Sequence, residues 1–72
     1  MIQPGQTYRS CSPRLRPERV HVTAYHPETR TVTVVDYATF SGPRDLPESY
    51  FHDSPLTRGG TPRRTGYALE QP

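Results

Sequence analysis

The stretch RVHVTAYHPETRTVTVVDY, residues 19–37, decides the fold of this chain. Apolar and polar side chains alternate in residues 19–25 and again in residues 31–37, and Pro27 and Glu28 lie between the two runs. Alternation with a period of two is typical of β-strands that bury one face, and a short polar segment with a proline is typical of the turn between them. The stretch therefore predicts two antiparallel strands, and with them a small β domain.

The valines of this hairpin predict its register. Val20, Val22 and Ala24 share one face of the first strand, and Val32 and Val34 must join that face to form a core. We therefore expect Val22 opposite Val34 and Ala24 opposite Val32, with three or five residues in the loop. A four-residue loop would place the two sets of valines on opposite faces.

The same register turns a carboxylate inward, because it places Asp36 opposite Val20. Two outcomes would avoid a buried charge. Either the sheet ends at Asp36, or a bulge near Val35 turns Val35 and Tyr37 inward instead.

Nine prolines limit the other elements of the chain. A proline in a helix interior costs about 3 kcal/mol, and the intervals between the prolines are too short for long helices. The fold class that we expect is all-β, a small five-stranded antiparallel barrel with long loops. Its strands are expected at 6–10, 19–25, 31–37 (extended by 38–40), 44–46 and 64–69, with a turn at 41–43, a single helical turn at 47–51 and a flexible loop at 52–63.

The size of the chain predicts a single domain, residues 1–72. A chain of this length buries only about 60% of the surface that it exposes when unfolded, so its stability should be marginal. Apolar residues make up 31% of the chain and are concentrated in a few stretches, which favours a small folded core over disorder. The expected core residues are Tyr8, Val20, Val22, Val32, Val34, Leu46, Phe51, Tyr67 and Leu69.

Three segments resemble a known group of proteins. They are PGQTY at residues 4–8, the Val-x-Val hairpin, and RRTGYAL at residues 63–69. With these segments the chain resembles the small uncharacterised SH3-like barrel proteins of actinobacteria and their mobile elements. The first segment is also similar to the opening of KOW-type barrels, but the glycine-centred KOW segment is absent, so the resemblance implies no ribosome or polymerase binding.

The strongest candidate for a binding site is GGTPRRTGY, residues 59–67. Glycines allow the backbone to approach a ligand closely, arginines can contact phosphates, and a tyrosine offers a stacking face. If the first and last strands are neighbours, the arginines around the first strand join the same surface. The predicted nucleic-acid-binding residues are Arg9, Arg14, Arg16, Arg63, Arg64 and Tyr67; the alternative is a flexible loop that leads into a strand whose Tyr67 and Leu69 belong to the core.

Arginine abundance has two interpretations. All nine basic residues are arginine, which suits phosphate and base edges better than lysine does. The same composition, with nine prolines and no lysine, also arises from the codon usage of a GC-rich genome. The arginine count alone is therefore weak support for nucleic-acid binding.

The residue pattern gives little support for a metal site, a disulfide or a catalytic cysteine. His21, His26 and His52 have no metal-ligand spacing, and the lone Cys11 can form no intramolecular disulfide. Cys11 lies between Arg9 and Arg14, which would lower the pKa of its thiol if they were close, but no base or oxyanion hole accompanies it. We expect a non-enzyme without cofactor or metal.

The location follows from two absences in the sequence. The N-terminal residues lack a basic segment followed by an apolar run, and no stretch reaches the roughly 18 apolar residues that span a membrane. We expect a cytoplasmic protein that does not bind membranes.

Two functions compete. The first is a nucleic-acid-binding accessory or regulatory factor that uses an arginine and tyrosine face, although a net charge of +2 is small. The alternative is a protein-interaction module, or a mobile-element regulator that docks on a host protein through Tyr8, Tyr25, Tyr50 and Phe51. The two differ in salt response, because phosphate binding weakens steeply as salt rises.

Overall fold

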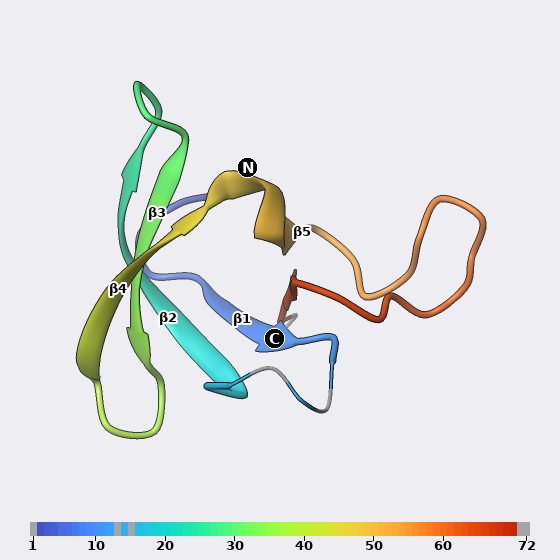
Figure 1. Ribbon diagram of the computed structural model, residues 1–72, viewed down its shortest axis with the longest axis horizontal. Helices are drawn as coiled ribbons and strands as arrows, with labels where there is room; N and C mark the ends of the chain where they lie inside the picture. The colour runs from blue at the N-terminus through green and yellow to red at the C-terminus, as the bar shows by residue number, and fades with distance from the viewer. Residues whose placement is uncertain (1, 13, 15, 71–72) are drawn as a thin grey trace.

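The computed structural model describes residues 2–12, 14 and 16–70, and in this part of the chain it confirms the all-β class (Figure 1). Most of the ordered elements are strands, and one 3₁₀ turn is the single helical element within residues 2–12, 14 and 16–70. The elements in chain order are β1 (Thr7–Ser10), β2 (Arg19–His26), β3 (Thr31–Asp36), β4 (Ser41–Pro47), η1 (Glu48–Tyr50), β5 (Phe51–His52) and β6 (Tyr67–Leu69).

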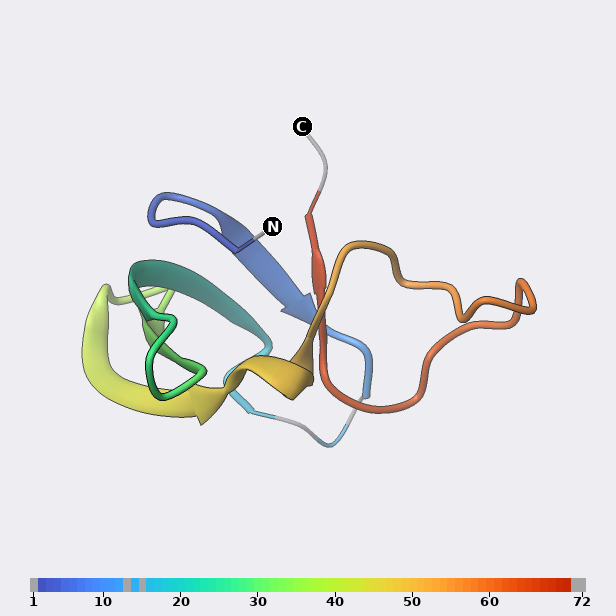
Figure 2. The same ribbon diagram turned by 90° about the horizontal axis from the view of Figure 1, so that it is seen from above.

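The strands form one sheet in the order β4-β3-β2-β1-β6-β5. Neighbouring strands are antiparallel except β5 and β6, which pair in parallel through Phe51 opposite Tyr67 and His52 opposite Ala68. The sheet curls into an open half-barrel (Figure 2). The described residues thus contain six strands rather than the expected five, because Phe51 and His52 form a short strand of their own.

The hairpin of β2 and β3 corrects the predicted register. Val22 lies opposite Val34 as expected, but Tyr25 lies opposite Val32, and the loop between His26 and Thr31 has the four residues that we had excluded. The register shifts between Val22 and Ala24, so Thr23 is an extra residue, a β-bulge. Because of this extra residue, the side chains after Thr23 lie on the opposite faces of β2 from those expected. Tyr25 therefore takes the inward position that was predicted for Ala24, and the valines of β2 and β3 share one face.

The next turn also differs from prediction. Strand β3 ends at Asp36, and its pairing with β4 shifts register between Val34 and Asp36, so Val35 is an extra residue there and its side chain is buried. The structure therefore combines parts of both outcomes considered. The Asp36 carboxylate accepts a hydrogen bond of 2.9 Å from the backbone N–H of Ala38. Residues 37–40 form a turn instead of extending the strand. Residues 41–43, expected as a turn, begin the exposed strand β4. The carboxylate remains near the surface and holds the turn, so no charge is buried.

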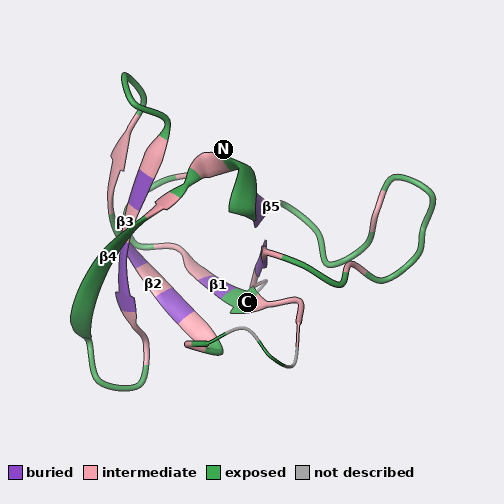
Figure 3. Ribbon diagram, in the orientation of Figure 1, coloured by how far each residue is buried: buried purple, intermediate pink, exposed green. Residues whose placement is uncertain are grey.

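The core lies inside the curl (Figure 3). The rings of Tyr8 and Phe51 meet edge to face with centroids 5.0 Å apart, and Phe51 stacks on Tyr67 at 5.8 Å. Such aromatic pairs stabilise a core beyond the area that they bury. Seven expected core residues are buried, namely Tyr8, Val20, Val22, Val32, Val34, Phe51 and Tyr67, while Leu46 and Leu69 are partly buried against them.

Candidate nucleic-acid interface

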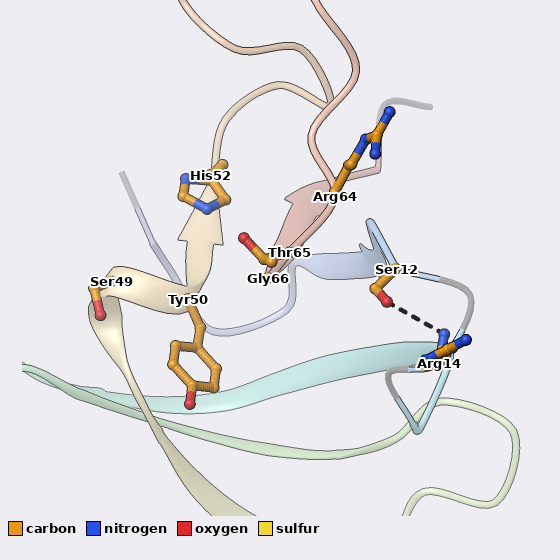
Figure 4. Close-up of a pocket in the computed structure, with 8 residues that line it drawn as sticks. All are labelled: Ser12, Arg14, Ser49, Tyr50, His52, Arg64, Thr65 and Gly66. Carbon is orange, nitrogen blue, oxygen red and sulfur yellow. Dashed lines mark hydrogen bonds between the residues drawn. The ribbon is translucent and has the colours of Figure 1, made fainter.

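A groove of about 530 Å³ lies where three segments of the chain meet (Figure 4). The loop after β1, the 3₁₀ turn with β5, and the residues before β6 each contribute side chains to it. The lining residues are Ser12, Arg14, Ser49, Tyr50, His52, Arg64, Thr65 and Gly66.

Backbone hydrogen bonds bring the first and third segments together. Strands β1 and β6 pair with Ser10 opposite Tyr67, and beyond this pair the N–H of Cys11 donates to the carbonyl of Gly66 at 2.9 Å. Two serine hydroxyls then stabilise the loop after β1. The N–H of Ser12 donates to Ser10 Oγ at 3.1 Å, and the N–H of Arg14 donates to Ser12 Oγ at 3.2 Å. The pairing of the first and last strands therefore places Arg14 at the groove.

Gly66 holds the second and third segments in close contact. Its φ is +77°, and a Cβ at this position would lie 2.5 Å from the carbonyl oxygen of Tyr50 and 3.0 Å from His52 Nε2. Real Cβ atoms do not come so close to a backbone atom, so glycine is required here for two reasons. The floor of the groove depends on this contact.

The charge of the groove is positive. Arg14 and Arg64 are exposed, and neither guanidinium makes an ion pair with any residue that the structure describes. No aspartate or glutamate is among the lining residues. Tyr50 adds a ring that is 44% exposed. Two guanidinium groups and an accessible ring thus line one groove, where the first can bind phosphate and the second can stack on a base.

Arg63 influences two titratable groups near the groove. Burial lowers the pKa of His52, and the positive charge of Arg63 lowers it further, against a smaller opposing effect of Asp53. Burial raises the pKa of the Cys11 thiol, and Arg63 opposes this only in part. The arginine that lowers the pKa of Cys11 is thus Arg63 and not the expected Arg9 or Arg14, and desolvation outweighs its effect. A raised pKa makes the thiol less reactive than a free cysteine.

The predicted binding residues do not form one surface. Arg14 and Arg64 share the groove, and Arg63 lies at its margin with its Nε donating to the carbonyl of Ser54 at 3.0 Å. Arg9 instead pairs with Glu18 at 3.7 Å. Arg16 lies at a separate hollow beside the turn that follows β3.

The structure corrects the predicted role of Tyr67 in binding. This residue was expected both as a stacking residue and as a core residue, and the structure buries it to 1% exposure, with its hydroxyl donating to the carbonyl of Pro17 at 2.9 Å. A ring enclosed in this way offers no face to a base. Tyr67 belongs to the core, and the accessible ring of the groove is Tyr50.

Sequence reasoning missed Tyr50 and His52 as partners of the arginines. The helical turn at Pro47 was predicted, and it is the element that presents Tyr50, but nothing in the sequence placed this turn beside residues 64–66. His52 had been weighed only as a metal ligand. Among the described residues no group of three or more histidine, cysteine, aspartate or glutamate side chains could hold a metal ion.

In the described part of the chain no helix has both the length and the apolar character needed to cross a bilayer. Comparison with protein-family models, with curated proteins and with solved structures finds no match to this chain.

Proposed function

We propose that this protein is a small non-catalytic nucleic-acid-binding factor and that the groove is its binding site. The observation that carries the proposal is the groove with Arg14 and Arg64, which form no ion pair with any described residue. Its lining residues include no carboxylate, and Tyr50 among them is accessible. Arginine forks match phosphate oxygens, and an exposed ring stacks on any base. The site needs no cofactor, and the proposed location is the cytoplasm, where nucleic acid is available.

We further propose that the half-barrel is an SH3-like fold, related to the small barrels of actinobacteria and their mobile elements. The antiparallel pairing of β1 with β6 and the single 3₁₀ turn before β5 support this relation. The additional strand β5 and the parallel pairing are departures from a plain five-stranded barrel.

The groove is tested by removing both arginine charges. In fluorescence anisotropy with labelled single- and double-stranded oligonucleotides, the wild type should bind at about 50 mM salt and weaken steeply by about 200 mM. Arg14→Gln with Arg64→Gln should weaken binding and reduce the salt slope by about one unit per lost phosphate contact. Arg14→Gln and Arg64→Gln are also measured singly, against Arg30→Gln, which removes one charge from the β2–β3 turn outside the groove. Each groove variant should reduce the salt slope, and Arg30→Gln should leave it unchanged.

Two results would overturn the proposal. One is no binding of any oligonucleotide at low salt, where the phosphate contribution is strongest. The other is equal weakening of binding by the three single variants Arg14→Gln, Arg64→Gln and Arg30→Gln, because the effect would then come from net charge alone.

Docking on a host protein is a second candidate, and one observation favours it. Phe40 is 57% exposed, and its ring lies 5.0 Å from that of His21 and 5.5 Å from that of Tyr37. An exposed aromatic group of this kind is typical of protein contacts. The aromatic groove first considered for this role has less support, because Tyr8 and Phe51 are buried.

A further inference from the structure

Residues 54–66, which we call the basic arm, double back as a narrow two-stranded ribbon whose two sides are joined between residues 55 and 63. The N–H of Thr57 donates to the carbonyl of Thr61 at 2.7 Å, the N–H of Arg63 donates to the carbonyl of Pro55 at 2.8 Å, and Leu56 and Pro62 form a β-bridge between these two bonds. The hydroxyls of Thr57 and Thr61 join the two sides at 2.7 Å. Cross-strand hydrogen bonds therefore define the shape of the arm.

The arm projects from the body of the protein in both views (Figures 1 and 2). Its tip is slim, because Gly59 and Gly60 carry no side chains and the open space around them is free of close neighbours. A ribbon that ends in two glycines can enter a narrow space that a bulkier loop could not enter.

The positive charge of the whole protein resides in this arm. Three of the nine arginines and none of the seven acidic residues lie in residues 54–66, which leaves six arginines against seven acidic residues elsewhere. Arg63 braces the base of the arm through Ser54. Arg58, next to the two glycines, is exposed and forms no ion pair with any described residue.

We infer that the arm enters the major groove of B-form DNA and that Arg58 contacts base edges there, an inference that rests on the proposed nucleic-acid function. The major groove of B-form DNA is about 12 Å wide and admits a two-stranded β-ribbon, whereas its minor groove is about 6 Å wide. The major groove of an RNA duplex is deep and too narrow for side chains to read. Arginine pairs with O6 and N7 of guanine through two hydrogen bonds. The partner is therefore double-stranded DNA, with Arg14 and Arg64 on the phosphates.

The inference is tested with three probes of one sequence: a DNA duplex, an RNA duplex and a DNA single strand. The wild type should prefer the DNA duplex, and Arg58→Gln should lose about tenfold in affinity for it, which is within the discrimination of a bidentate contact. Replacing guanine by 7-deazaguanine in the duplex removes the N7 acceptor. This replacement should weaken binding of the wild type and leave binding of Arg58→Gln unchanged. Arg30→Gln is the matched control for the lost charge.

The outcomes separate this inference from the proposed function. Equal affinity of the wild type for the DNA and RNA duplexes, no effect of 7-deazaguanine on the wild type, or binding to single strands alone would overturn the arm inference and leave the groove proposal in place. No binding to any of the three probes would overturn both. Because Arg58 is exposed, Arg58→Gln should melt like the wild type, and a thermal melt verifies that its effect is not one of folding.

Discussion

At the scale of single residues, two glycines with similar backbone conformations have different roles. Gly60 at the arm tip has φ +86° and Gly66 at the groove has φ +77°, but only Gly66 has other atoms where a Cβ would be. The nearest is the carbonyl oxygen of Tyr50, a backbone atom that cannot turn away. A side chain at position 66 would therefore displace the residues that line the groove, whereas a side chain at position 60 would meet no other atoms.

Alanine substitution at the two positions separates conformational strain from collision. Gly60→Ala should cost about 1–2 kcal/mol, the usual penalty for an L-residue in the left-handed region. Gly66→Ala should cost clearly more, because η1 or β5 must also move away. Thermal melting with circular dichroism measures both. Equal melting temperatures for the two variants would show that the contact at Gly66 is easily relieved.

At the scale of elements, much of the hairpin could be predicted from sequence and its irregularity could not. The valine pattern fixed the buried face and paired Val22 with Val34, which requires only alternation. It could not reveal the extra residue at Thr23, because a four-residue loop with a bulge and an odd-numbered loop without one bury the same valines. The groove was beyond prediction for a similar reason. It depends on how a β1 loop, a 3₁₀ turn and the start of β6 meet in space.

The bulge can be tested by deleting one residue. Removal of Thr23 leaves Val22 opposite Val34 and Tyr25 opposite Val32, so the hairpin should become regular and keep its core. Removal of His21 instead forces Val20 or Val22 to the outer face, at a cost of about 1.5–3 kcal/mol for the lost burial of a valine. The first deletion variant should therefore melt at a higher temperature than the second. The reverse order, measured by circular dichroism, would contradict the assigned bulge.

At the scale of the whole molecule, the fold separates a core from a charged periphery. The radius of gyration is 11.5 Å, near the value of about 11 Å for a compact domain of this length, even though the arm projects. The body is therefore tightly curled around its few buried side chains. The groove and the arm lie where β1 meets β6. Among the described residues, the core contains no ionisable side chain other than its tyrosines.

This arrangement links stability and binding to pH through His52. The pKa of His52 is lowered by burial and by Arg63, so below a pH of about 6.5 the unfolded chain binds protons more readily than the folded protein. Stability should be full above about pH 6.5 and should fall as the pH falls toward the lowered pKa of the folded state. His52→Gln should remove this part of the decrease in melting temperature, while His26→Gln, outside the groove, should keep it.

Binding should depend on pH in the opposite direction. Phosphate in the groove favours the charged imidazole, so the affinity for an oligonucleotide should rise as the pH falls from about 7.5 to about 6. The rise should be absent in His52→Gln, because glutamine does not titrate, and present in His26→Gln. Anisotropy titrations over this range measure it, at a salt concentration that keeps binding weak enough to resolve. If the affinity of the wild type stays constant or decreases over this range, His52 does not lie close to the bound phosphates. The phosphate-binding site is then limited to the side of the groove formed by Arg14 and Arg64.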